Sequence, residues 1–177
     1  LTNAGFIIVD NTLKALQELA GKNRAKFKNP VIGITGSNGK TIIKEWLFHC
    51  LSKVKRVARN PKSYNSQIGV PLSVWLLEND NDIGIFEAGI SQPEEMEKLH
   101  KIIKPTLGIL TNIGEAHQEN FSSVEQKIDE KLKLFKGCET LIYCKDHQLI
   151  DNSISTKSLD NDIKLFNWSF SQKSDLQ

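Results

Sequence analysis

The chain contains 177 residues, of which 39% are hydrophobic and 25% are charged, values typical of a globular domain. This length is enough for one domain with a full core and too short for two large ones. The 23 Lys and Arg residues nearly balance the 21 Asp and Glu residues, giving a net charge of +2, so we expect no nucleic-acid partner.

The sequence also shows no sign of targeting to a membrane or an oxidising compartment. No apolar run approaches the ~20 residues that span a bilayer, and no basic stretch precedes an apolar core at the start. Cys50, Cys138 and Cys144 lack metal-ligand spacing, and we expect them to be reduced, mostly buried thiols. We therefore expect a cytoplasmic location without membrane contact. Because the first residue is Leu1 rather than Met, we also expect a piece of a longer chain.

The N-terminal stretch predicts one helix followed by a linker. A strand-like run precedes Asp10 and Asn11, either of which can cap a helix. Four apolar residues share one face of this helix: Leu13, Leu16, Leu19 and Ala20. We expect the helix to end near Gly21 and the polar stretch 22–30 to form a linker. A domain boundary is therefore predicted just before Pro30.

The most informative stretch is a glycine-spaced loop between a predicted strand and a predicted helix. The apolar run 31–35 predicts a short buried strand, and the apolar positions after residue 41 recur at helical spacing. Glycines let backbone N–H groups turn toward an anion, and a helix N-terminus adds partial positive charge. Lys40 is placed to reach the β- and γ-phosphates of a nucleotide, and the Thr41 hydroxyl can bind Mg²⁺. The expected phosphate-binding residues are Gly36, Ser37, Asn38, Gly39, Lys40 and Thr41.

This loop departs from the strict G-x-x-x-x-G-K-[ST] pattern, because Ile34 stands where the first glycine would be. The alternative interpretation is a glycine-rich turn that only caps a helix. The position of Gly-Lys-Thr directly between strand and helix favours the phosphate-binding loop.

From residue 31 onward, short apolar runs alternate with helical patterns, which indicates a parallel sheet with crossover helices. The expected strands are 31–35, 55–58, 83–87, 107–111, 140–144 and 163–166, and the expected helices are 40–52, 69–78, 93–103 and 122–135. We expect the tail after Asp151 to be a loop. The predicted fold class is therefore α/β, with a mostly parallel, doubly wound sheet.

Polar residues follow two of the predicted strands, at the edge where ligands gather in open parallel sheets. Glu87 ends one strand, and a strand-end carboxylate opposite a phosphate-binding loop is suited to Mg²⁺. The alternative is a surface glutamate that only terminates the strand. Asn112 and His117 follow another strand, where His117 has either a metal-binding or a structural role. The segment 60–72, rich in amides and hydroxyls, is either a substrate loop or an ordinary loop.

Together these motifs resemble those of the Mur ligase family, the ATP-dependent amide-forming enzymes of peptidoglycan precursor synthesis. The loop 35–41 is similar to the family's T-G-[ST]-[NS]-G-K-[ST] loop, which accounts for the glycine spacing. The other similar stretches are 34–44 with Glu45, 65–72, 87–89 and 111–117. The resemblance implies that residues 1–29 are the end of an N-terminal domain plus a linker. It implies that residues 30–177 form a central ATP-binding domain, incomplete at its C-terminus.

The resemblance also implies roles for single residues. Lys40 would contact the transferring phosphoryl group of ATP. Thr41 would bind a first Mg²⁺, and Glu87 and His117 would also hold magnesium, His117 on a second ion between the γ-phosphate and the acceptor carboxylate. The expected substrate contacts are Asn65, Gln67 and Asn112, although Ser66 stands where an asparagine is common.

Lys131 matches a family lysine that CO₂ converts to a carbamate. Only an uncharged amine captures CO₂, and burial favours the uncharged form. Four lysines lie between positions 127 and 136, so the alternatives are another lysine of this group or a solvated helix lysine at Lys131.

Within the family, the chain is most similar to the branch that joins D-Ala-D-Ala to UDP-N-acetylmuramoyl-tripeptide, through an acyl phosphate. Residues 61–77 resemble the form that is fused to an alanine racemase. No stretch resembles the family's later adenine-contacting segment or its amino-acid-binding domain, so we expect the chain alone not to form the amide. The alternatives are another Mur ligase or folylpolyglutamate synthase, a different P-loop hydrolase or kinase, and a nucleotide-binding module without activity.

Overall fold

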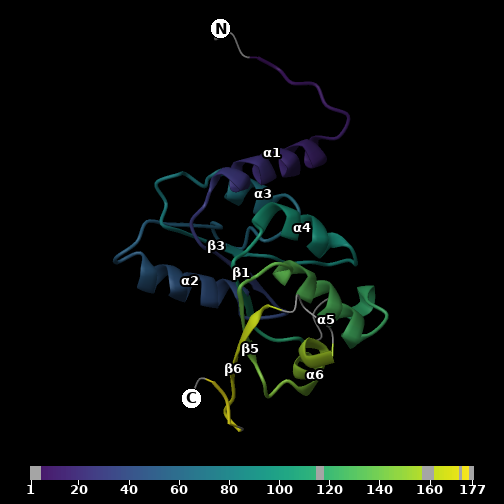
Figure 1. The fold of residues 1–177 in the computed structure, drawn as a ribbon. Helices are drawn as coiled ribbons and strands as arrows, with labels where there is room; N and C mark the ends of the chain where they lie inside the picture. The colour runs from purple at the N-terminus through teal and green to yellow at the C-terminus, as the bar shows by residue number, and fades with distance from the viewer. Residues whose placement is uncertain (1–4, 115–117, 157–161, 172, 176–177) are drawn as a thin grey trace.

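The computed structural model describes residues 5–114, 118–156, 162–171 and 173–175. Six strands and six α-helices make up most of this part of the chain (Figure 1). The strands are β1 Val31–Thr35, β2 Val57–Arg59, β3 Ile83–Glu87, β4 Leu107–Leu110, β5 Thr140–Cys144 and β6 Lys164–Trp168. The helices are α1 Thr12–Lys26, α2 Lys40–Leu51, α3 Gly69–Trp75, α4 Glu95–Ile103, α5 Val124–Leu132 and α6 Gln148–Thr156, with 3₁₀ turns η1 Gln118–Asn120 and η2 Lys133–Phe135.

The six strands form one sheet in the order β2-β3-β1-β4-β5-β6, and every neighbouring pair is parallel. The predicted α/β class with a parallel, doubly wound sheet is confirmed. All carboxyl ends of the strands lie at the same edge, so the loops after β1, β3 and β4 meet there.

Helices cover both faces of the sheet with two separate apolar clusters. The smaller cluster joins Ile32, Ile34 and Ile85 of the sheet to the inner face of α2. The larger cluster joins the opposite face to α1, α3, α4, α5 and α6. Figure 1 shows α2 on one side of the sheet and α1, α3 and α4 on the other. The phosphate-binding loop therefore runs from the centre of the sheet into a helix packed beneath it.

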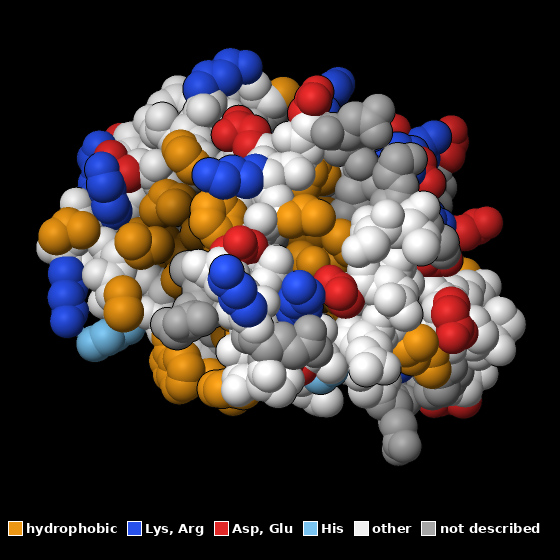
Figure 2. All heavy atoms as spheres, turned by 60° about the horizontal axis from the view of Figure 1, so that its bottom comes forward, with side chains coloured by type: hydrophobic (Ala, Val, Ile, Leu, Met, Phe, Trp, Pro, Cys, Tyr) orange, Lys and Arg blue, Asp and Glu red, His pale blue; other side chains and the backbone are white. Residues whose placement is uncertain are grey.

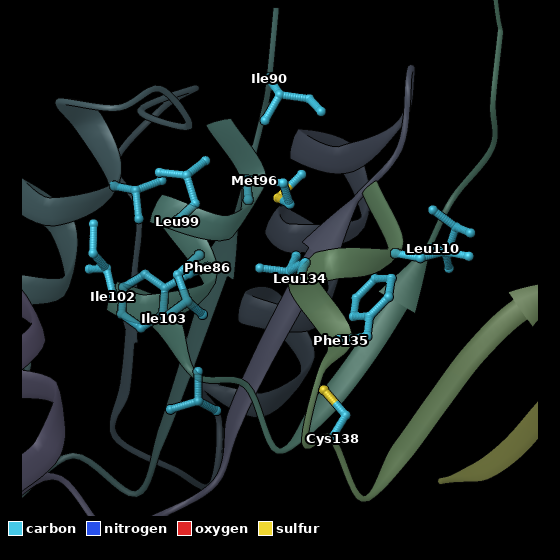
Figure 3. Packing of buried hydrophobic residues seen from close by; sticks show 14 of the residues in the cluster. Phe86, Ile90, Met96, Leu99, Ile102, Ile103, Leu110, Leu134, Phe135 and Cys138 are labelled. Atoms are coloured by element: carbon cyan, nitrogen blue, oxygen red, sulfur yellow. The ribbon is translucent and has the colours of Figure 1, made fainter. Parts of the chain in front are cut away.

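Two glycines in the sheet let other segments approach the backbone closely, η2 at Gly108 and Pro105 at Gly33. A Cβ on Gly108 would lie 2.4 Å from the Phe135 ring, and one on Gly33 would lie 2.8 Å from Pro105. Leu134 and Phe135 are fully buried, and Figure 3 shows them among the packed side chains of the larger cluster. Because η2 continues directly from α5, this packing fixes α5 above the carboxyl end of β1.

The first helix differs from the sequence prediction. Asn11 caps it as expected, since its Oδ1 accepts a hydrogen bond from the Lys14 amide. The helix nevertheless continues past Gly21 to Lys26, through residues predicted to be a linker. The buried Arg24 guanidinium holds it there by donating to the carbonyls of Ile103 and Lys104. Those contacts with α4 were not visible in the local sequence pattern.

The C-terminal part also departs from the prediction. Residues predicted as a loop after Asp151 belong to α6, whose Ile150 and Ile154 are buried in the larger cluster. The helix expected at 122–135 divides into α5 and η2. Ser123 caps α5 by accepting from the Gln126 amide, and Gln126 Oε1 accepts from the Ser122 amide in return. The short β2 begins at Val57 rather than at residue 55.

The surface carries several apolar side chains. No helix in the described ranges has the length and hydropathy to cross a membrane. Large exposed hydrophobic residues lie before α1 and on α2 and α3, and include Phe6, Ile8, Ile42, Trp46 and Trp75. In Figure 2, hydrophobic side chains form several groups on one face, with Lys and Arg side chains among them. Exposed apolar groups of this kind are where proteins contact other proteins or domains.

Candidate functional site

The phosphate-binding loop needs glycine at two positions for different reasons. Gly36 has a φ of 144°, and a Cβ there would lie 1.9 Å from Thr111 Oγ1. Gly39 has a φ of 81° and is the N-cap of α2, and a Cβ added there would have no neighbour within 4 Å. The loop thus depends on a close approach to β4 at Gly36 and on a left-handed turn at Gly39.

We expect Gly36→Ala to lower the free energy of unfolding by at least about 2 kcal/mol, because backbone strain and overpacking add. Gly137→Ala is the matched control, since Gly137 has a φ of 70° but no neighbour within 4 Å of the added Cβ. Urea unfolding of the three proteins measures the difference. Equal losses in both variants would contradict the close approach to Thr111.

Residues after β4 hold the loop in this shape. The Ser37 amide donates to the Asn112 carbonyl at 2.8 Å, and the Asn38 amide donates to Asn112 Oδ1 at 3.0 Å. Thr111 Oγ1 donates to the Asn38 carbonyl at 2.6 Å. Two of the expected phosphate-binding amides are therefore bonded to Asn112. The anion-binding donors that remain are those at the start of α2, where a helix leaves its first N–H groups without a partner.

Lys40 begins α2 and folds back over the loop. Its Nζ donates to the carbonyls of Gly36 at 2.8 Å and Ser37 at 3.1 Å. Burial lowers the pKa of the Lys40 amine, and the Glu87 carboxylate offsets part of this effect. The amine thus lies beside the N-terminus of α2, where a phosphoryl group would be bound.

Thr41 and Glu87 meet at the carboxyl end of β3. Thr41 Oγ1 donates to Glu87 Oε2 at 2.8 Å, and Asn65 Nδ2 lies 3.5 Å from Glu87 Oε1. Glu87 is fully buried, so it is not the surface glutamate of the alternative interpretation. Asn60 Oδ1 accepts from the Glu87 amide and fixes its backbone. A hydroxyl and a carboxylate placed this way suit Mg²⁺, which binds through one or two carboxylates together with phosphate oxygens and water.

Sequence reasoning missed Lys44, which lies one helical turn after Lys40. Its side chain is fully buried, 3.8 Å from Glu87 Oε1 and 3.3 Å from Glu45 Oε1. Its Nζ also donates to the Lys62 carbonyl. The available signal was a lysine among the apolar positions of α2, because a charge there requires a buried partner.

Lys131 reaches the phosphate-binding loop from α5. It is buried, and its Nζ lies 3.2 Å from the Gly36 carbonyl. Burial lowers its pKa to about 7, with further lowering from the charges of Lys40 and Lys127. Together with Lys40, Asn65 and Ser91, it lines a pocket of about 140 Å³ beside the loop. The alternative of a solvated helix lysine therefore does not fit Lys131.

Two other predicted site residues have different surroundings. Asn112 braces the loop, as described above. Gln67 lies outside the small pocket: its Nε2 donates to the Glu95 carbonyl, and its Oε1 accepts from Gln17. It lines a groove of about 660 Å³ between α1 and α4. His117 lies outside the described residues.

The described ranges contain no group of three or more His, Cys, Asp or Glu side chains that could hold a metal. Cys50 is exposed, and Cys138 and Cys144 are buried thiols. Among the described residues, the Thr41 hydroxyl is a further candidate ligand for a divalent ion at Glu87, beside nucleotide phosphates and water.

Two ligases and one crystal structure are similar to this chain. The UDP-N-acetylmuramoyl-tripeptide–D-alanyl-D-alanine ligase of Bacillus subtilis is 35% identical over 159 residues, 88% of this chain and 35% of the relative. The ligase of the same name from Borreliella burgdorferi is 40% identical over 129 residues, 73% of this chain and 28% of the relative. The crystal structure of the MurF ligase of Thermotoga maritima in complex with ADP matches with a TM-score of 0.82 and 25% identity. That match covers 97% of this chain and 40% of the other.

The chain thus spans about a third of the length of these two relatives. Residues 34–177 match the family described as the Mur ligase middle domain. This match begins in β1 and includes the whole phosphate-binding loop, Glu87 and Lys131. The chain therefore belongs to the Mur ligase family, through its middle domain.

Proposed function

We propose that this chain is the nucleotide-binding part of an ATP-dependent ligase that adds D-Ala-D-Ala to UDP-N-acetylmuramoyl-tripeptide. The observation that carries the proposal is the pocket of about 140 Å³ in which Lys40 and Lys131 meet beside the phosphate-binding loop. Relatives at 35% and 40% identity have the name of that ligase. The parent protein would therefore be an acid–D-amino-acid ligase of peptidoglycan synthesis that works in the cytoplasm.

ATP would bind with its phosphates at the N-terminus of α2, where Gly39, Lys40 and Thr41 offer backbone donors. Thr41 and Glu87 would hold Mg²⁺ from the protein side, and His117 is proposed as a further ligand on the resemblance alone. The ion would supply positive charge that offsets the charge of the phosphoryl group. Lys40 would add its own charge at the same place.

The proposed reaction has two steps. An oxygen of the tripeptide's terminal carboxylate attacks the γ-phosphorus of ATP, which forms an acyl phosphate and releases ADP. The amine of D-Ala-D-Ala then attacks the acyl carbon, loses a proton and expels phosphate, which leaves the amide. The pocket between Lys40, Lys131 and Asn65 is the place where the carboxylate and the phosphoryl group would meet.

Lys131 is the proposed site of a carbamate. Its amine faces the loop rather than solvent and has a pKa of about 7, so about half of it is uncharged at pH 7. Uncharged amine nitrogen attacks CO₂, and loss of a proton leaves a carbamate anion. That anion would lie among cations, near Lys40 and Lys127, whose charges act on the amine.

The substrate contacts follow from the surroundings of the predicted residues. Asn65 lines the pocket, so it is proposed to contact the reacting groups. Gln67 is proposed to contact the sugar-nucleotide substrate at the groove between α1 and α4. Asn112 would act on the nucleotide through the loop that it braces. Residues 1–29 remain proposed as the end of an N-terminal domain, and a fused alanine racemase remains proposed from residues 61–77.

The test uses the intact parent protein with ATP, Mg²⁺, UDP-N-acetylmuramoyl-tripeptide and D-Ala-D-Ala. We expect phosphate release and amide formation in equal amounts, and only when both acceptor substrates are present. Replacing D-Ala-D-Ala by L-glutamate or meso-diaminopimelate is the matched control and should give no product. Phosphate release without either acceptor would favour a hydrolase, and product with a folate acceptor would favour a folylpolyglutamate synthase.

A further inference from the structure

Lys44 is a fully buried cation at the edge of the proposed metal site. It lies on α2 one turn after Lys40, and no part of its side chain is exposed. A buried ammonium group is costly unless anionic and hydrogen-bonding partners surround it. Lys44 has three such partners: the carboxylates of Glu87 and Glu45, and the carbonyl of Lys62.

These contacts distinguish the two oxygens of Glu87. Oε1 faces Lys44 at 3.8 Å and Asn65 at 3.5 Å, whereas Oε2 accepts from the Thr41 hydroxyl at 2.8 Å. Lys44 therefore attracts Oε1 by its positive charge. The other oxygen is left beside Thr41, where the ion would bind.

Lys44 also anchors the segment that carries Asn65. It bonds to the carbonyl of Lys62, a residue with a left-handed φ of 48°. In the same turn, the Asn60 side chain donates to the Tyr64 carbonyl and accepts from the Glu87 amide. One ammonium group thus connects α2, the 60–65 turn and the end of β3.

A second ion pair keeps Glu45 in place. Arg59 Nη1 lies 2.7 Å from Glu45 Oε1, and the Arg59 guanidinium stacks 4.0 Å above the Phe48 ring. Glu45 is thereby shared between Arg59 and Lys44. Glu45 therefore compensates part of the positive charge of Lys44, and Glu87 is not the sole carboxylate partner of this ammonium group.

We infer that Lys44 is a positioning residue for the magnesium site, because it holds Oε1 of Glu87 and the Lys62 carbonyl while Oε2 stays beside Thr41. The inference rests on the proposed nucleotide and magnesium site. In the proposed site Lys44 acts through Glu87 and the Lys62 carbonyl. Its effect is on how strongly Mg²⁺ enhances nucleotide binding.

The test is calorimetric titration of the intact parent protein with ADP, with and without Mg²⁺. The readout is the dissociation constant of ADP without Mg²⁺ divided by the dissociation constant with Mg²⁺. A change in overall stability does not alter this ratio. We expect Lys44→Met to lower this ratio by about tenfold, which is the effect of losing one well-placed charge contact. Lys44→Arg should keep the ratio within about threefold of the original, because it restores a cation that bonds to carboxylates. Lys53→Met, at an exposed position after α2, should leave the ratio unchanged.

Two further variants separate loss of the Lys44 charge from loss of the fold. Lys44→Gln keeps a donor for the Lys62 carbonyl without the charge. It should also lower the ratio, and it replaces Lys44→Met in the test if that variant does not fold. In a Glu87→Gln background, Lys44→Met should lower the ratio by a smaller factor than in the unsubstituted protein, because the part of its effect that acts through Glu87 is already lost. An unchanged ratio in Lys44→Met or Lys44→Gln would overturn the inference. Absence of any Mg²⁺ enhancement in the unsubstituted protein would instead overturn the proposed site.

Discussion

Glu87→Gln should lower the kcat of the intact parent protein by about 100-fold to 1,000-fold, the range found for loss of one charge-stabilising contact at a reacting group. The carboxamide has nearly the same shape as the carboxylate and still accepts from Thr41. It lacks the negative charge that would attract Mg²⁺. Because the defect is weaker binding of the ion, raising the Mg²⁺ concentration should restore part of the activity. Phosphate release measured over a range of Mg²⁺ concentrations tests both expectations.

The control for this variant is Glu97→Gln, at a glutamate that is partly exposed and paired with Lys101. It should leave kcat unchanged. Glu87→Gln also leaves the buried Lys44 with Glu45 as its carboxylate partner, so thermal unfolding must be measured beside activity. His117→Ala is expected to lower turnover in the same way, on the resemblance alone. A double Glu87→Gln, His117→Ala variant with normal turnover would contradict the metal assignment.

Lys131→Ala should lower kcat by about 100-fold, because the proposed carbamate and its charge are lost from the pocket. Adding a small carboxylate such as acetate or formate should restore part of the activity, since it can occupy the space that the side chain leaves. The unsubstituted enzyme should lose activity when bicarbonate is removed. The variant should not respond to bicarbonate.

Lys136→Ala is the matched control, because Lys136 lies in the same segment but is exposed. It should retain full activity and the response to bicarbonate. Full activity of Lys131→Ala without any additive would show that another lysine, or another mechanism, is used.

The pKa of Lys131 also predicts a pH dependence of stability. In the folded chain its pKa is about 7, against 10.5 for an exposed lysine. Between these two values the unfolded chain binds the proton and the folded chain does not, so stability rises with pH across this window. As pH falls from 10.5 to 7 the same contribution is lost, and below 7 it is constant. Unfolding of Lys131→Met, compared with the original chain in the absence of CO₂, should lack this rise.

Elements whose signals are local could be predicted from the order of the amino acids. The strand 31–35, the glycine loop and the start of α2 are adjacent in the chain, so the pattern of apolar residues and glycines is sufficient to predict them. Glu87 was predicted as a strand-end carboxylate, because the carboxyl ends of parallel strands meet at one edge. The alternation of strands and helices also predicted the parallel α/β sheet, which the structure confirms.

The extent of α1 and the presence of α6 depend on contacts between distant parts of the chain. The residues after Gly21 have a polar pattern, yet they are helical because Arg24 bonds to the end of α4. Likewise, α6 is held by Ile150 and Ile154, which pack against the larger cluster. Contacts between distant parts of the chain override local propensity, and a local pattern cannot contain them.

The same reason explains the site residues. Asn112 and Gln67 have side chains suited to a substrate, but their partners are Asn38 in the loop and Gln17 in α1. The sequence alone assigned no role to Lys44, because its partners Glu87 and Lys62 are distant in the chain. Which lysine of 127–136 approaches the loop depends on how α5 lies over β1, and that is set by the packing of Phe135 against Gly108. Residue type and order were enough to predict the family and the fold class, whereas burial and charge compensation required the folded chain.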